Sequence, residues 1–549
     1  MSGLKFIVDG KNIEIDKQSV KLSEIAKIVE DRYPGQICSG IINNRLYDLN
    51  HTLYDNETIA FVDTTNEDGN RVYFRGLSLM LAMACKELFN RKVYVKHSIS
   101  GGLYCVFKET RTLKEEEINA IRNKMLEYVR KDYEIETIYM PTDEAIDMFE
   151  KSKRLDKANL LKYRKEDVIK VYCCNGYYDC FYGNMFPSTG YMSDLDVEKM
   201  ADGMVIMGAK NGLKGNISEF KEMQKLSDVY RESEQWSRTL GIDSVVDLNR
   251  IIEKNEYGEM IRTVEALHEK KIAEIADTIV KSGSKVILIA APSSSGKTSF
   301  AHRLSIQLKV NGLKPLPISI DNYFLNREFT PIDQDGEHDF ESIEAVDIKQ
   351  FNRDINDLIQ GKEINKIEFD FLTGKRVVTD EKIYLGKNQP IILEGIHGLN
   401  PSLTEFIDDE LKFKIYISVI TQINLDDHNR IPTTDLRLIR RMVRDYNFRG
   451  YSAEKTIEKW PSVRRGENKN IFPYQEQADV MFNSASVFEL SVLKTQAKKI
   501  LGEINENSNY QIEANRLREL LQYFYEIEDL GDIGPTSIIR EFIGGSRIL

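Results

Sequence analysis

A run of small residues ending in Gly-Lys-Thr is the strongest chemical signal in the sequence. The run 291–298, Ala-Pro-Ser-Ser-Ser-Gly-Lys-Thr, follows an apolar stretch and fits G-x-x-x-x-G-K-[ST] except for its first residue. Backbone N–H groups of such a loop wrap a phosphate, so we expect Lys297 to reach the β- and γ-phosphates and Thr298 to bind Mg²⁺. An ordinary turn is the competing interpretation. The predicted ATP-binding residues are Ala291, Pro292, Ser293, Ser294, Ser295, Gly296, Lys297, Thr298 and Ser299.

Two carboxylates are expected to face this loop. Asp321 and Glu394 each end an apolar, strand-like run, and ligands of open parallel sheets bind at the carboxyl ends of the strands. Phosphoryl transfer to an alcohol needs one acidic group near Mg²⁺ and a second that accepts the alcohol proton. We therefore predict that Asp321 is the catalytic base and that Glu394 belongs to the metal site. A solvated strand cap is the alternative for each residue taken alone.

Arginines with helical spacing form a third signal. Arg437, Arg440, Arg441 and Arg444 share one face of a helix, and Arg449 follows them. Like charges at this spacing repel each other, and a dense anion such as a triphosphate would offset the repulsion. The pattern favours phosphate binding and charge stabilisation during transfer. A solvated face paired with glutamates elsewhere is the alternative.

Strands and helices that alternate from residue 285 onward must position these residues. The alternation predicts an α/β domain with a parallel sheet over 283–495, and a helical segment with a tail over 496–549. Arg464 and Arg465 are expected just beyond a helix. The predicted strands are 286–290, 316–320, 390–394, 412–418 and 478–483. The predicted helices are 297–310, 347–360, 433–448, 452–460, 486–504 and 512–528.

The first 282 residues have an α+β pattern. Residues 1–64 predict a small mixed sheet with one helix, including a hairpin across Asp9-Gly10. Residues 65–225 predict a second α+β unit, and 226–282, charged and poor in Gly and Pro, predict a helical connector. The fold class is therefore multidomain. The predicted elements are strands at 4–8, 11–15, 39–46, 58–62, 92–97, 103–107 and 170–182, and helices at 20–31, 77–89 and 113–131.

Composition limits the classes of function. Lysine and arginine number 75 against 87 aspartates and glutamates, a net charge of −12, so a polyanion site has to be a local basic patch. No apolar run approaches the ~20 residues of a membrane span, and the N-terminus lacks a signal-peptide core, so we expect a cytoplasmic protein. The six cysteines contain no C-x-x-C pair and are expected to be reduced.

Residues 283–490 resemble the uridine kinase and phosphoribulokinase family of P-loop kinases. The matching segments are 291–298, 321–324, 339–347, 369–371, 394–396 and 440–450. The resemblance implies ATP and Mg²⁺ as cofactors and transfer to the 5′-hydroxyl of a nucleoside such as uridine or cytidine. It implies Asp321 and Lys297 as catalytic residues and a lid that contains Arg441, Arg444 and Arg449. The implied substrate-binding residues are Phe324, Phe340, Glu341, which would bind ribose hydroxyls, Phe369 and Arg441, with His397 as a further candidate.

Three positions depart from the uridine kinase pattern. The histidine that contacts the pyrimidine corresponds to a place near Gly374, a lid arginine is Tyr451, and a helix glutamine is Lys459. The contacts that read the base therefore differ, while the phosphate machinery matches. An alternative acceptor is a sugar phosphate, as in phosphoribulokinase, for which Arg327 is the candidate second anion site.

The first 225 residues resemble the N-terminal part of threonyl-tRNA synthetase, a ubiquitin-like TGS domain followed by an editing-type domain. The matching segments are 97–104 and 183–190. The metal motif of that domain falls near Gly76 and Met80 and on Phe181 and Met185, so we expect a binding or regulatory module without hydrolytic activity. A second hypothesis is a nucleotide-gated regulator that contacts tRNA or RNA, supported by the basic residues within 151–169. The sequence does not determine whether the chain forms an oligomer, and the tail at 534–544 is expected to pack on the kinase-like domain.

Overall fold

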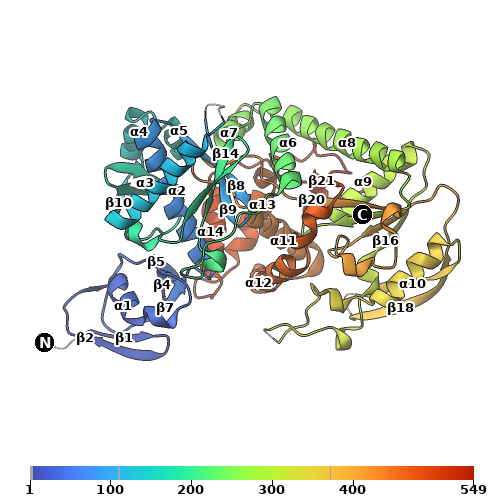
Figure 1. Cartoon of the computed structure of the whole chain (residues 1–549), viewed down its shortest axis with the longest axis horizontal. Helices are drawn as coiled ribbons and strands as arrows, with labels where there is room; N and C mark the ends of the chain where they lie inside the picture. The colour runs from blue at the N-terminus through green and yellow to red at the C-terminus, as the bar shows by residue number, and fades with distance from the viewer. Residues whose placement is uncertain (1–3, 109–111, 335, 371–372) are drawn as a thin grey trace.

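The computed structural model describes residues 4–108, 112–334, 336–370 and 373–549. Phe371, which belongs to the segment 369–371 noted above, lies outside these residues. The chain is multidomain: two α+β units at the N-terminus precede an α/β unit with a parallel sheet, as the sequence predicts (Figure 1). The N-terminal unit lies at one end of the molecule, and α10 with β18 lies at the other (Figure 1).

A five-stranded mixed sheet with the order β2-β1-β7-β4-β5 forms the N-terminal unit, and α1 packs on it. The hairpin across Asp9-Gly10 is confirmed: both residues have positive φ, 48° and 75°, and Val8 pairs with Lys11. The expected single strand at 39–46 is two strands, because Asn43 and Asn44 adopt positive φ and make a turn. The elements are β1 Leu4–Val8, β2 Lys11–Ile15, β3 Val20–Lys21, α1 Leu22–Val29, β4 Ile37–Ile42, β5 Arg45–Asp48, β6 Thr52–Leu53 and β7 Glu57–Asp63.

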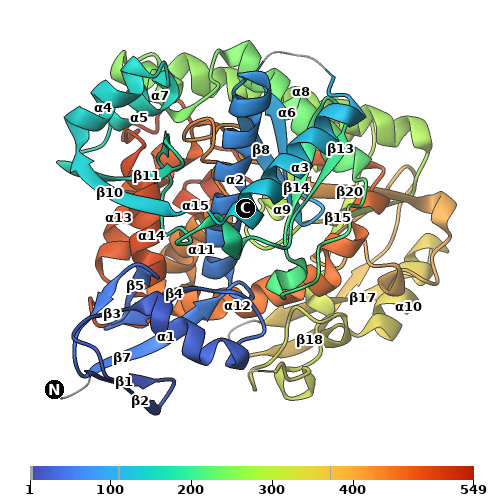
Figure 2. The same ribbon diagram turned by 60° about the vertical axis from the view of Figure 1, so that its left-hand side comes forward.

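The second unit places a long buried helix against a four-stranded antiparallel sheet of order β13-β14-β9-β8. Figure 2 shows this helix, α2, at the centre of the molecule. It begins ten residues earlier than expected, because Asn66 caps it through the N–H of Asp68. The elements are α2 Glu67–Phe89, β8 Val93–Ile99, β9 Gly102–Phe107, α3 Glu115–Lys131, β10 Ile135–Pro141, α4 Thr142–Lys151, α5 Leu155–Leu161, β11 Val168–Cys174, β12 Tyr177–Asp179, β13 Asp196–Met200 and β14 Gly203–Met207.

A five-stranded parallel sheet with the order β16-β19-β15-β20-β21 is the frame of the third unit. A separate hairpin, β17 with β18, follows α10 and had no counterpart among the expected elements. The elements are β15 Val286–Ala290, α9 Lys297–Val310, β16 Leu316–Ser319, α10 Ile348–Ile359, β17 Ile364–Asp370, β18 Lys375–Ile383, β19 Ile391–Glu394, β20 Lys412–Ser418, α11 Thr433–Arg449, α12 Ala453–Asn470, β21 Val480–Asn483, α13 Glu489–Gly502, α14 Gln511–Gln522 and α15 Arg540–Ile543.

The expected end of one helix is wrong. The helix predicted at 452–460 continues to Asn470 as α12, with Pro461 inside it, so Arg464 and Arg465 lie on the helix and not beyond it. Proline removes one backbone hydrogen bond and usually bends or ends a helix. Here the apolar residues on both sides of it, Ile457 and Val463, join the same buried core, and this packing favours continuation.

The helical segment between the second and third units belongs to the core of the parallel sheet. It contains α6 Gln224–Leu240, α7 Val245–Glu253 and α8 Tyr257–Ser282. Ile272, Ile275 and Ile279 of α8 are buried in the same cluster as Ile287 and Ile289 of β15. The alternate residues of β15 face the other side of the sheet, toward α10. The segment is therefore a layer of the α/β unit and more than a connector.

A loop of the third unit is buried in the second unit. Residues 419–432, between β20 and α11, carry Asp426, whose carboxylate is 2.7 Å from Nζ of the fully buried Lys157. Lys157 also pairs with Asp179, and His428 Nδ1 lies 2.6 Å from the same aspartate. The Val95 N–H donates to the carbonyl of Asp427. Because these buried charges satisfy one another across the boundary, the two units are joined by more than a linker.

The six cysteines are free thiols, and five of them are buried. Among the helices of the described residues, none combines the length and apolarity that a bilayer span needs.

The role of α8 as a core layer predicts the effect of shortening one of its buried side chains. Ile275→Ala should lower the free energy of unfolding by about 2–5 kcal/mol, because it leaves a cavity against β15. Val280→Ala, on the exposed face of α8, is the matched control and should change it by about 0.5 kcal/mol or less. Urea unfolding measures both. Equal, small effects would show that α8 is only a linker.

Candidate active site

The loop between β15 and α9 has a backbone suited to an anion. Ser294 and Gly296 adopt positive φ, 60° and 74°, and Gly296 directly precedes α9. The first N–H groups of a helix have no partner within the helix, so they are available to a ligand. Ala291 has no positive φ and is fully buried, so an alanine fits the first position of the pattern without strain.

Two arginines of the predicted stripe donate hydrogen bonds to backbone carbonyl groups of this loop. Arg437 forms a buried ion pair with Glu467, and its Nε donates to the carbonyl of Ser293 at 3.0 Å. Arg440 pairs with Glu489 and donates to the carbonyl of Ser294 at 3.3 Å. This half of the stripe is paired with distant glutamates, as in the alternative interpretation, although it is buried and not solvated.

The other half of the stripe leaves positive charge in excess. Arg441, Arg444 and Arg449 all approach the buried carboxylate of Asp445, at 3.4, 2.9 and 3.5 Å. Burial lowers the pKa of Arg441 and of Arg449, and the charge of Arg444 lowers both further. Three guanidinium groups therefore share one carboxylate. Arg441 also donates to the Ser293 hydroxyl at 2.6 Å, which places this charge beside the loop.

Lys297, Glu394 and Asp321 form the second charged group at the loop. Lys297 Nζ makes an ion pair with Glu394. Burial opposes the charge of Lys297, but the carboxylates of Glu394 and Asp321 raise its pKa. Burial raises the pKa of Asp321, Glu394 raises it further, and Lys297 and Arg449 oppose the increase. These mutual effects show that the three side chains and Arg449 lie within one electrostatic environment.

The oxygen atoms in this group suit a divalent cation. Thr298 is at the start of α9, which follows β15, Glu394 ends β19, and Asp321 follows β16, so the three residues lie at the same edge of the sheet. Mg²⁺ binds through one or two carboxylates together with phosphate oxygens and water. The donor set therefore fits Mg²⁺, with Thr298 and Glu394 as the residues that would hold it.

Three aromatic rings gather beside Asp321. Phe324 packs edge-to-face on Phe340 at 5.9 Å and on Phe369 at 5.7 Å between ring centres. Glu341 is next to them, and burial raises its pKa to about 7 although Arg441 opposes the increase. Within the described residues, Oε2 of Glu341 is buried without a hydrogen-bond partner. The structure thus brings together an apolar wall and a carboxyl oxygen that is available for hydrogen bonding.

His397 has a different position. It is buried in the loop after β19, and burial lowers its pKa to about 4. The neutral ring lies close to the backbone of Ser342, on the segment that carries Glu341. This place suits support of that segment better than direct contact with a substrate.

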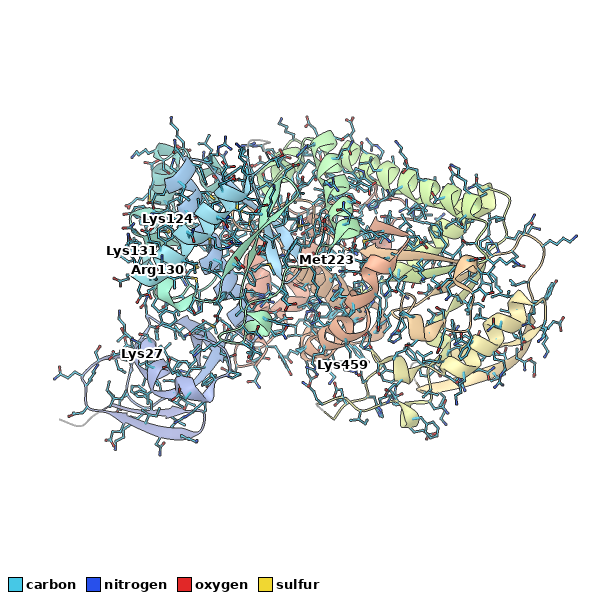
Figure 3. All side chains as sticks on the ribbon, viewed as in Figure 1. Lys27, Lys124, Arg130, Lys131, Met223 and Lys459 are labelled. Carbon is cyan, nitrogen blue, oxygen red and sulfur yellow. The ribbon has the colours of Figure 1, made fainter. Side chains whose placement is uncertain are left out.

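The three departures from the uridine kinase pattern have structural partners. A β-carbon at Gly374, where φ is 67°, would lie 2.8 Å from Nε of Arg327, so the arginine fills the space that a larger side chain would need. Lys459, labelled in Figure 3, has its Nζ 5.3 Å from the ring centre of Tyr451. The two replaced positions near the arginines thus contact each other.

Sequence reasoning missed the acidic partners of this site. Glu467 and Glu489 are 30 and 49 residues from the arginines they neutralise. No local pattern marks such pairs. Glu467 also accepts a hydrogen bond from the N–H of Ser293 at 2.9 Å, so it shapes the loop directly.

The positions of the missing metal motif in the second unit are apolar. Met80, Phe181 and Met185 are buried in one hydrophobic cluster, and a β-carbon at Gly76 would meet the sulfur of Met192. None of these side chains supplies the imidazole, thiolate or carboxylate group that a zinc site needs. In the part of the chain that the structure describes, no group of three or more His, Cys, Asp or Glu residues could hold a metal ion.

Basic residues within 151–169 are largely neutralised. Lys157 and Arg154 pair with the buried Asp179, and Lys162 pairs with Glu150 at 2.8 Å. Arg164 pairs with Glu166. The run is therefore not a continuous basic face.

Comparisons with known proteins agree with both resemblances. Residues 286–491 match the family model described as Phosphoribulokinase / Uridine kinase family. The uridine kinase of Bacillus pumilus is 30% identical over 203 residues, which cover 37% of this chain and 87% of that protein. A possible uridine kinase from Bacillus stearothermophilus, of solved structure, has 17% identity and a TM-score of 0.28, and the match covers 39% of this chain and 98% of that one.

The N-terminal region matches threonine–tRNA ligases. The ligase of Caldanaerobacter subterraneus subsp. tengcongensis is 26% identical over 195 residues, which cover 35% of this chain. The chain spans only 30% of the length of that ligase.

The raised pKa of Glu341 predicts how stability depends on pH. The folded pKa, about 7, is above the ordinary value of 4.5, so the stability that the protonated group contributes is complete below about pH 4.5 and is lost as the pH rises through 7. Glu341→Gln mimics the protonated form. It should gain stability over the wild type between pH 5 and pH 8.5, by about 3 kcal/mol at most. Denaturant unfolding at both pH values measures the gain.

The exposed Glu344, on the same segment, is the matched control. Glu344→Gln should follow the wild type at both pH values. An equal response of the two variants would show that Glu341 is solvated in the folded protein.

Proposed function

Because this chain belongs to the phosphoribulokinase/uridine kinase family, we propose that its C-terminal half transfers the γ-phosphoryl group of ATP to a hydroxyl group of a small, sugar-containing acceptor. The single observation that carries the proposal is the arrangement of charge around the loop 291–298. Three guanidinium groups share one carboxylate, and Lys297 lies in the same electrostatic environment as Asp321 and Arg449. A triphosphate would supply the anion that this arrangement needs.

In the proposed reaction, Asp321 accepts the proton of the acceptor hydroxyl. Its raised pKa improves it as a base, since a carboxylate of ordinary pKa takes up a proton poorly near neutral pH. Lys297 exchanges its contact with Glu394 for phosphate oxygens, and Arg444 and Arg449 stabilise the charge that spreads over the transferring group. Mg²⁺ held by Thr298 and Glu394 would neutralise part of the phosphate charge.

The proposed acceptor is a nucleoside that reacts at its 5′-hydroxyl. The rings of Phe324, Phe340 and Phe369 offer an apolar wall for a base, and Glu341 offers a buried oxygen for ribose hydroxyls. Arg441, whose charge reaches Glu341, would help to hold the bound acceptor.

One observation favours a phosphorylated sugar as the acceptor instead. Arg327 lies against Gly374, at the place that corresponds to the base-contacting histidine of uridine kinases. A guanidinium group there suits an anion better than a neutral pyrimidine.

The tRNA hypothesis for residues 1–225 has weaker support. The ligase-like region has an α+β fold, but the basic residues that supported the hypothesis are mostly engaged in ion pairs. We propose that this half acts as a scaffold or regulatory module for the kinase half. Binding that depends on salt, measured with tRNA and the full chain, would reverse this preference.

Substitution of the two central residues tests the proposed reaction. Lys297→Ala should abolish turnover, and Asp321→Asn should lower kcat by about 10²–10⁴-fold while ATP still binds, because only the proton acceptor is lost. Lys309→Ala, at the exposed end of α9, is the control and should leave the rate unchanged. Near-normal activity of Asp321→Asn would exclude it as the base.

An acceptor screen distinguishes the two classes of acceptor. ATP consumption should be measured with nucleosides, sugar alcohols and sugar phosphates, with Lys297→Ala as the blank. We expect nucleosides to be used and Arg327→Ala to change their KM less than threefold. Preference for a sugar phosphate, with a KM raised tenfold or more by Arg327→Ala, would identify the alternative acceptor.

A further inference from the structure

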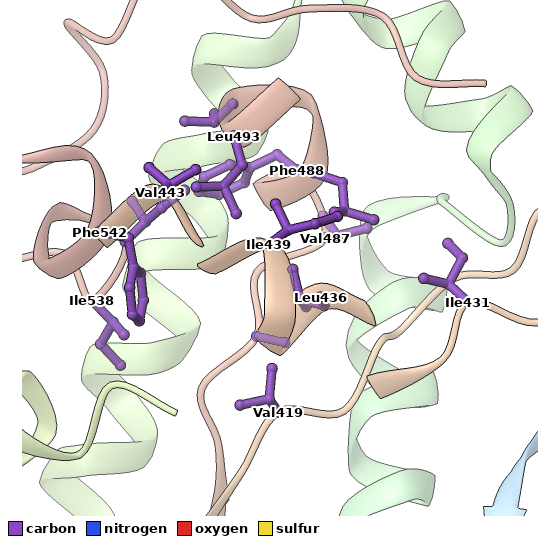
Figure 4. Close-up of a cluster of buried hydrophobic side chains, with 14 of the residues drawn as sticks. Val419, Ile431, Leu436, Ile439, Val443, Val487, Phe488, Leu493, Ile538 and Phe542 are labelled. Atoms are coloured by element: carbon purple, nitrogen blue, oxygen red, sulfur yellow. The ribbon is translucent and has the colours of Figure 1, made fainter. Parts of the chain in front are cut away.

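The C-terminal segment 534–544 packs against the phosphate-binding loop. A β-carbon at Gly296 would lie 2.3 Å from Cγ2 of Ile538, so the tail touches the residue that opens α9. Phe542 is fully buried, and the Arg440 guanidinium lies 4.9 Å from its ring centre. Figure 4 shows Ile538 and Phe542 within the apolar cluster that also contains Val443 and Phe488. The backbone of the segment is therefore firmly anchored.

This anchoring places the carboxylate of Glu541 on the first turn of α9. The Ser299 hydroxyl donates to Glu541 Oε2 at 2.7 Å, and the Ser299 N–H donates to the same oxygen at 3.4 Å. Glu541 also contributes to the electrostatic environment that raises the pKa of Lys297. The carboxylate thus occupies N–H and O–H donors of the helix start that forms the phosphate site.

A carboxylate and a phosphate cannot both use these donors without repulsion. Both are anions, and the first turn of one helix offers only a few free donors. Glu467 already occupies the Ser293 N–H at the other end of the loop, and buried ion pairs fix it there. Glu541 has no ion pair of this kind among the described residues and is only half-buried. Its side chain is therefore the internal anion that a ligand can displace.

We propose that Glu541 is an internal competitor for the nucleotide: its carboxylate occupies the start of α9, and a nucleoside triphosphate must displace it to bind. The proposal rests on the proposed function, since it assumes that the loop receives phosphates. The tail stays anchored through Ile538 and Phe542, so only the Glu541 side chain has to move. The contact raises the Kd of any ligand that needs these donors. The effect is greatest for small anions, which make too few contacts to displace the carboxylate.

Equilibrium binding tests the proposal without any turnover. Titration calorimetry of the full chain with a non-hydrolysable ATP analogue, with and without Mg²⁺, gives the Kd. Glu541→Gln removes the charge and Glu541→Ala also frees the donors, so each should lower the Kd by about tenfold at low salt. The gain should shrink as salt increases, because the repulsion is screened. Glu528→Gln, at an exposed carboxylate six residues before this segment, should leave the Kd unchanged.

Each contrary result has a distinct meaning. If the wild type binds the analogue and both Glu541 variants bind it no more tightly, the competitor role is wrong. If they bind it more weakly, Glu541 contributes to binding, and weakening only with Mg²⁺ would make it a metal ligand. If neither the wild type nor any variant binds the analogue, the proposed function fails, and the competitor role fails with it.

Discussion

Buried ion pairs behind the loop 291–298 are the interaction on which the site depends. Arg437 with Glu467, and Arg440 with Glu489, lie out of solvent, and each arginine also donates to a loop carbonyl. A buried charge that loses its partner destabilises a protein by about 3–5 kcal/mol, so the pairs hold α11, α12 and α13 in one arrangement. Because these arginines hydrogen-bond to the carbonyl groups of the loop, the loop has its shape before a ligand binds.

The two halves of the chain share this need to satisfy buried charge. Lys157 of the ligase-like unit has its partners in Asp179 and in Asp426 of the loop 419–432. That loop leads directly into α11, which carries the arginines of the site. A change at the boundary between the units would therefore reach the site through a short, well-packed connection. This link gives the ligase-like half a physical route to influence the kinase half.

Local patterns in the sequence were sufficient for the strand–loop–helix unit around Lys297, the parallel sheet and the Asp9-Gly10 hairpin. Features that depend on distant residues were not predictable. Proline inside α12 is tolerated because the flanking side chains are buried in the core, and the burial of α8 against β15 depends on tertiary packing. The acidic partners of the arginines come from other helices. Spacing identified the arginine stripe, but only the structure separates the half that pairs with Glu467 and Glu489 from the half that shares Asp445.

We propose that the loop, the arginines around Asp445 and Lys297 form a triphosphate site, with Asp321 at the acceptor side. A crystal structure with an ATP analogue, Mg²⁺ and a nucleoside tests it most directly. We expect phosphates along 291–298, Lys297 moved from Glu394 to a phosphate oxygen, and Asp321 within hydrogen-bond distance of the acceptor hydroxyl. An analogue bound elsewhere while the loop 291–298 is unchanged, or Asp321 turned away from the acceptor, would be inconsistent with this proposal.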